Sequence, residues 1–102
     1  MEIIRKLTDM IGEEIDDADK YATCALKHKD SNRDLADVFY RLSTEEMGHM
    51  NMLHEQAAKI IEAYRRDKGE PPAEMMAVYD YLHKQHIDHA ASVKAKQMLY
   101  KE

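Results

Sequence analysis

The sequence predicts an all-α chain of three helices, and three observations support this prediction. Glycine and proline are scarce, with three and two in 102 residues, so the chain has few places to turn. Apolar residues recur every three to four positions along three long segments, which is the periodicity of amphipathic helices. Charged residues make up 34% of the chain, which suits helices with charged outer faces. We expect helices over about 3–29, 32–68 and 72–101, the first two as an antiparallel hairpin, in a single domain spanning 1–102.

The first expected helix has one face on which a glutamate and a tyrosine interrupt smaller or apolar residues. Cations at residues 27–29 suit a helix C-terminus, where they complement the helix dipole. Ser31, with Asp34 three residues later, resembles a capping box that opens the second helix. The residues of the face, spaced three and four apart, are Ile4, Leu7, Ile11, Glu14, Ala18, Tyr21 and Ala25.

The second expected helix is apolar on two sides and ends before Gly69 and two prolines, which are typical of a helix terminus. A helix with two apolar sides needs two neighbours, so we expect this helix to be central. The third helix carries apolar residues from Met75 to Tyr100. The first stripe of the second helix is Leu35, Phe39, Leu42, Glu46, His49, Leu53, Gln56 and Ile60; the second stripe is Ala36, Tyr40, Met47, Met50, Ala57, Ile61 and Tyr64.

Composition excludes several classes of partner and compartment. The net charge of −5 and the isoelectric point near 5.6 leave no basic patch for a nucleic acid. No apolar run approaches the roughly 20 residues that a membrane span requires, and the N-terminal residues lack a signal-peptide core. The single cysteine, Cys24, excludes an intramolecular disulfide and suits a reducing compartment. We therefore expect a cytoplasmic protein with no nucleic-acid or membrane partner.

Three polar residues interrupt the apolar stripes of the first two helices: Glu14, Glu46 and His49. A buried carboxylate needs a partner, a metal or a proton. If the turn centres on Asp30, Glu14 precedes it by 30 − 14 = 16 residues and Glu46 follows it by 46 − 30 = 16, so the hairpin places them level. Glu46 and His49 are three apart and project to one side. We expect the three to converge; the alternative is a hydrated helix edge with ordinary hydrogen bonds.

These residues resemble those of a known family. A Glu on one helix and Glu-x-x-His on the next is half of the ligand set of ferritin-like dinuclear carboxylate proteins. Residues 42–50 look like the second-helix motif of rubrerythrin-type proteins, and Glu14 with Tyr21 is similar to their first helix; the resemblance covers about residues 3–64. It implies a pair of iron ions held by Glu14, Glu46 and His49, with Tyr21 as an outer hydrogen-bond partner.

The chain departs from the family in carrying a single Glu-x-x-His. Third-helix positions level with the motif are about 94 and 91, and Lys94 and Ala91 supply no suitable ligands. We therefore expect a homodimer, or a higher even oligomer, in which two hairpins form a ferritin-like four-helix bundle and share the iron. This arrangement resembles the encapsulated ferritins, which are half-ferritins with a tail that directs them into a shell. The helix-like sequence from Met98 to Glu102 does not suggest such a tail.

The expected reaction is ferrous iron oxidation by oxygen or peroxide, or peroxide reduction in the rubrerythrin manner. A peroxidase would need a separate electron donor, because one cysteine cannot build the usual electron-transfer iron site. The alternative is a non-enzymatic dimerisation or adaptor module on the same scaffold, holding another divalent metal or none.

A weaker second site is conceivable from His54, His86 and His89, since His54 and His86 lie level across the second turn. The alternative is that these are exposed or hydrogen-bonded histidines, because histidines three apart fan out around a helix. Eight methionines, some beside His49 and His54, would suit copper(I) as soft ligands. Methionine is more often a flexible core filler.

Overall fold

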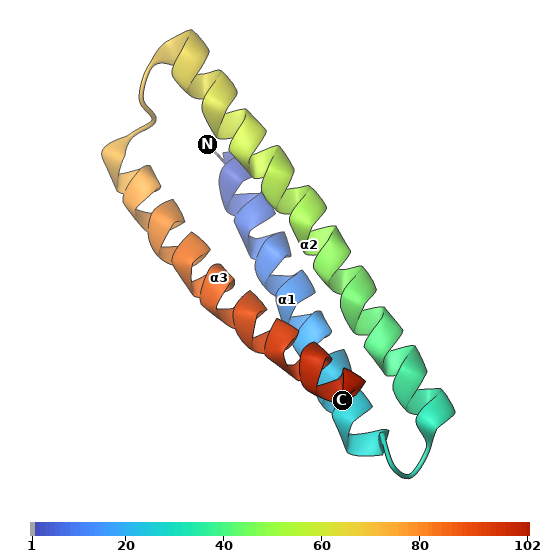
Figure 1. The fold of residues 1–102 in the computed structure, drawn as a ribbon. Coiled ribbons are helices and arrows are strands. Elements are labelled where there is room, and N and C mark those ends of the chain that lie inside the picture. The colour runs from blue at the N-terminus through green and yellow to red at the C-terminus, as the bar shows by residue number, and fades with distance from the viewer. Residues whose placement is uncertain (1) are drawn as a thin grey trace.

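The structure is a computed structural model that describes residues 2–102, and within that range it contains three α-helices and no strand. Helix α1 spans Glu2–His28, α2 spans Arg33–Lys68 and α3 spans Ala73–Lys101. The prediction of an all-α chain with three helices is confirmed. The helices run side by side in an elongated body of 55 × 19 × 18 Å (Figure 1). No helix in the described range is both long enough and apolar enough to cross a membrane.

The local sequence explains how α2 begins and how it ends. Asn32, rather than Ser31, caps α2: its side-chain oxygen accepts a hydrogen bond from the Leu35 N–H at 3.2 Å. The expected capping box at Ser31 is therefore wrong by one residue. At the other end of α2, Gly69 adopts φ +87° and its N–H donates to the Arg65 carbonyl at 3.1 Å. A side chain at Gly69 would be strained in this left-handed conformation.

The central helix is α1, so the expectation that α2 is central is wrong. Helix α1 packs against both other helices, whereas α2 and α3 touch each other little, and Figure 1 shows α1 between them along most of its length. A sequence stripe predicts that a face will be covered but does not say by which neighbour. The broad buried face of α1 consists of Ile4, Leu7, Thr8, Ile11, Ile15, Ala18, Ala22 and Ala25.

Polar contacts join the three helices along the C-terminal half of α3. The buried Ser43 hydroxyl donates to the Ala18 carbonyl at 2.7 Å and accepts from the Gln97 side-chain amide at 2.9 Å. Asp19 on α1 accepts from Lys96 on α3 at 2.6 Å and lies 2.9 Å from a ring nitrogen of His89. These contacts fix the height and rotation of α3 against α1.

Only one of the two apolar stripes of α2 is buried within the chain. The second stripe supplies the buried residues Ala36, Ala57 and Ile61. The first stripe, which we call the open stripe, is partly exposed throughout; Leu35, for example, keeps 38% of its surface accessible. Helix α3 does not cover the open stripe, and the candidate site lies on it. Its residues are Leu35, Phe39, Leu42, Glu46, His49, Leu53, Gln56 and Ile60.

Candidate metal centre

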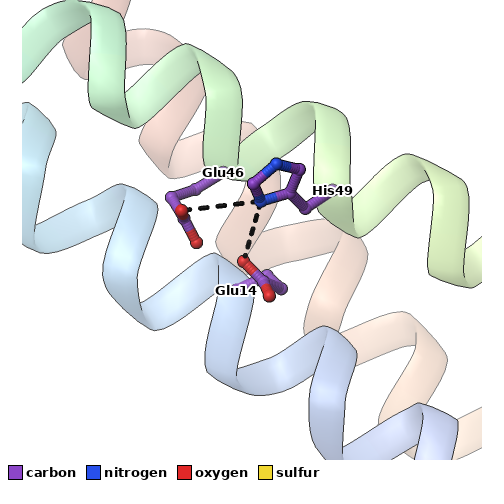
Figure 2. Close-up of side chains that lie close together, drawn as sticks. All are labelled: Glu14, Glu46 and His49. Carbon is purple, nitrogen blue, oxygen red and sulfur yellow. Dashed lines mark ion pairs between the residues drawn. The ribbon is translucent and has the colours of Figure 1, made fainter.

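The structure brings Glu14, Glu46 and His49 together at the middle of the α1–α2 hairpin, as the count from the turn predicted (Figure 2). Glu14 comes from α1, while Glu46 and His49 come from adjacent turns of α2. The Nδ1 atom of His49 lies 3.6 Å from Glu14 Oε2 and 3.5 Å from Glu46 Oε1. One ligand atom from each residue lies within 4.8 Å of the other two. We call these three residues the triad.

These separations suit a shared ion better than direct pairing. Distances of 3.5 and 3.6 Å are too long for strong hydrogen bonds between the imidazole and the carboxylates. A first-row metal ion lies about 2.0–2.2 Å from its nitrogen and oxygen ligands, so ligands of one ion are roughly 3–4 Å apart. Two carboxylates and an imidazole are donors that iron, zinc and manganese accept. The triad therefore fits a transition-metal ion in both spacing and donor type.

Burial makes the two carboxylates chemically unusual. The Glu14 and Glu46 side chains are 25% and 19% exposed, and the Oε2 atom of Glu14 is fully buried without a hydrogen-bond partner among the described residues. Hydrogen bonding with the Glu14 carboxyl, followed by burial and the Glu14 charge, raises the pKa of Glu46 from 4.5 to about 7. The nearby His49 lowers the pKa of Glu46 and so offsets part of this rise. The pair thus favours a shared positive charge, either a proton or a metal ion.

The triad opens to solvent on its α2 side. The His49 side chain is 56% exposed, whereas both carboxylates are largely covered. Helix α3 supplies no member of the triad; Lys94 and Ala91, which the register placed nearest, are exposed and belong to no ligand group in residues 2–102. One chain therefore offers three ligands beside an accessible face.

Tyr21 occupies the same stripe of α1 as Glu14 but has a different neighbour. Its ring stacks on Phe39 of α2, with centroids 6.3 Å apart, and Phe39 also stacks on His28 at 6.1 Å. No hydrogen bond joins Tyr21 to the triad within the described part of the chain. Its role as an outer hydrogen-bond partner stays a prediction.

The structure separates the three histidines of the weaker second site. His54 and His86 line one pocket between α2 and α3, but His89 turns to α1, where it contacts Asp19 at 2.9 Å. The third histidine of the pocket is His83, whose ring stacks on His54 with centroids 4.7 Å apart. Burial, with the nearby His83 charge adding to it, lowers the pKa of both His54 and His86.

Sequence reasoning missed His83 because the rotation of α3 about its axis was unknown. Apolar residues occur all around α3, including the exposed Val78, Tyr81 and Met98, so no single face indicated which histidines point inward. In the structure, contacts of Asp19 on α1 with His89 and Lys96 hold α3 in its observed rotation.

No protein-family model, curated protein or solved structure matches this chain. The chemistry of the triad and the arrangement of the helices that carry it are therefore the basis for a functional conclusion.

Proposed function

We propose that this protein is a ferritin-like half-unit that binds ferrous iron between two copies of the chain and promotes its oxidation. The observation that carries this proposal is the triad itself. Glu14 from one helix and Glu46 with His49 from the next are half of a ferritin-like dinuclear ligand set. Their ligand atoms lie within 4.8 Å of one another, and one carboxylate oxygen is buried without a hydrogen-bond partner.

A second copy would complete the centre. A pair of iron ions requires more ligands than one chain offers, and a two-fold dimer would supply four carboxylates and two imidazoles. His49 is accessible to a partner, with 56% of its side chain exposed. The apolar residues of the open stripe flank the triad, and α3 leaves them partly exposed. Burying them against a second hairpin would form a four-helix bundle around the site.

Iron is one of the ions that this donor set accepts, and it would allow redox chemistry at the site. Bound iron would supply one-electron exchange and open positions for oxygen or peroxide. The chain itself holds the two carboxylates close together and shields them from water. Glu46, with a pKa of about 7, can hold a proton at the site near neutral pH and give it up when a cation binds. Ferrous iron is the proposed substrate, because peroxide reduction would require an electron donor from another protein.

The test is oxygen consumption after addition of ferrous iron to the purified protein. We expect the wild-type chain to accelerate oxygen uptake over buffer, and Glu46→Ala or His49→Ala to abolish the acceleration while far-UV circular dichroism stays helical. Glu45→Ala is the matched control, because Glu45 neighbours the triad but is exposed and outside it. If all three variants behave like wild type, the triad is not the site. If wild type neither binds iron nor consumes oxygen, the scaffold is a helical module without this activity.

A further inference from the structure

A second cluster of potential metal ligands lies between α2 and α3. A cavity of about 240 Å³ between α2 and α3 is lined by three histidines together with Met50, Ile11 and Ile87. We call it the imidazole pocket. It shares no residue with the triad, and it brings His54 from α2 together with His83 and His86 from α3.

We propose that the imidazole pocket is a second metal site, which takes a soft or borderline transition-metal ion, Zn²⁺ or Cu⁺, through His54, His83 and His86. This inference is independent of the proposed iron chemistry, because different residues carry it. Three neutral imidazoles are a familiar ligand set for such ions.

The lining of the pocket selects the class of ion. None of its residues is a carboxylate and Asn51 supplies the one side-chain oxygen of the lining, so the pocket is poorly suited to the hard cations Ca²⁺ and Mg²⁺. Imidazole nitrogen suits zinc and copper, and the Met50 thioether adds a soft donor that suits Cu⁺. Of the apolar neighbours, Ile11 is buried, whereas Ile87 lies 53% exposed at the edge of the pocket.

Local packing prepares the histidines for this role. His54 and His86 are both partly buried between the helices. Gly12 on α1 leaves room for His86: a side-chain carbon at Gly12 would lie 3.2 Å from His86 Nε2. The ring of His86 therefore lies in a recess that most other residues at position 12 would narrow.

Binding requires the rings to move. Across residues 2–102, only the triad brings three ligand atoms within 4.8 Å of one another. In the pocket, His54 and His83 lie nearly parallel, with 14° between their planes, and His83 also stacks on Tyr79 with centroids 5.7 Å apart. To share an ion, the His54 and His83 rings must rotate out of this stack. Metal binding should consequently change the environment of Tyr79 as well as the histidine rings.

The experiment titrates the protein with Zn²⁺ against a chromophoric chelator, and anaerobically with Cu⁺ against bicinchoninate. Both titrations use a Glu46→Ala, His49→Ala background, so that the triad does not contribute. We expect about one ion per chain to bind in that background, and His54→Gln with His83→Gln to remove it. His89→Gln is the matched control, since His89 lies on the same helix but contacts Asp19.

Binding of Zn²⁺ alone or of Cu⁺ alone supports the site and identifies its preferred ion. The site is refuted if neither ion binds in this background, or if the His54 and His83 substitutions leave binding unchanged.

An NMR experiment on the wild-type protein tests the same assignment without relying on variants that misfold. With the preferred ion added, the ring nitrogen signals of His54, His83 and His86 should shift in NMR spectra while those of His89 stay in place. Shifts confined to His49 or to His89 would also overturn the assignment.

Discussion

Glu14 and Glu46 place two carboxyl groups at one point of the hairpin, and the nearby His49 offsets their mutual repulsion only in part. The raised pKa of Glu46 reflects this: its proton is retained to about pH 7 because the Glu14 carboxyl and burial both disfavour its charged form. A metal ion bound by the triad would replace that proton. The same two carboxylates that destabilise the metal-free fold therefore provide the affinity for a cation.

Replacing Glu46 with glutamine should stabilise the metal-free protein at pH 8 and have little effect at pH 4. The folded-state pKa of about 7 exceeds the ordinary value of 4.5, so the folded chain holds this proton more tightly. The resulting stability is fully present below pH 4.5 and is lost as the pH rises through 7. Since one pKa unit corresponds to about 1.4 kcal/mol, the difference between 4.5 and about 7 sets the gain at pH 8 at about 3 kcal/mol. Urea unfolding with a chelator present measures it. A Glu46→Gln variant no more stable than wild type at pH 8 would contradict the raised pKa.

The triad was predictable because an antiparallel hairpin has a simple register. Both helices rise by the same distance per residue, so equal counts from the turn at Asp30 place Glu14 and Glu46 level. The pairing of His83 with His54 was not predictable in this way. The rotation of α3 depends on contacts of Asp19 with His89 and Lys96, and these become visible only when the helices are packed.

Among the secondary-structure elements, α2 begins with a single side-chain cap. The Asn32 side chain accepts from the Leu35 N–H, one of the donors that the helix start leaves unpaired. Asn32→Ala should lower the free energy of unfolding by about 1 kcal/mol, whereas Ser31→Ala should change it little. Thermal or urea unfolding of the two variants distinguishes them. A larger loss with Ser31→Ala would restore Ser31 as the cap.

A partly buried ion pair between Asp19 and Lys96 helps to hold α3 against α1. Hydrogen bonds from Lys96 and then His89 lower the pKa of Asp19, so this contact stabilises the fold above the ordinary aspartate pKa and weakens as the pH falls below it. Lys96→Met should cost about 1 kcal/mol, and the cost should shrink towards pH 3. Lys94→Met, at an exposed position of the same helix, is the control. Equal unfolding curves for the two variants would show that the Lys96 pair contributes nothing.

How the helices assemble was harder to predict from sequence than their existence. Scarce glycine and proline, the 3.6-residue period and Gly69 were sufficient to predict three helices and the end of α2. The two apolar stripes of α2 led to the expectation that α2 is the central helix, and this expectation was wrong. Helix α3 packs mainly on α1, and the open stripe around Phe39 and Leu42 is left partly exposed. If a second copy of the chain covers the open stripe, as we propose, its exposure within one chain is expected.

For the molecule as a whole, the proposed dimer makes the open stripe an interface. Leu42 lies on that stripe one turn from Glu46, so Leu42→Arg should place a charge in the apolar interface and favour the 11.9 kDa monomer. Tyr81→Arg is the control, because Tyr81 is 64% exposed on α3, away from the stripe. Sedimentation equilibrium measures both masses. A Leu42→Arg protein that keeps the mass of wild type would exclude the open stripe as the interface.

The most direct test of the shared iron centre combines two quantities from one sample. After anaerobic loading with ferrous iron and removal of the excess, elemental analysis gives iron per chain and light scattering gives the molar mass. We expect about one iron per chain, since two chains share two ions, in an oligomer whose mass is an even multiple of 11.9 kDa. A protein that retains no iron, or that stays at the mass of one chain, would contradict it.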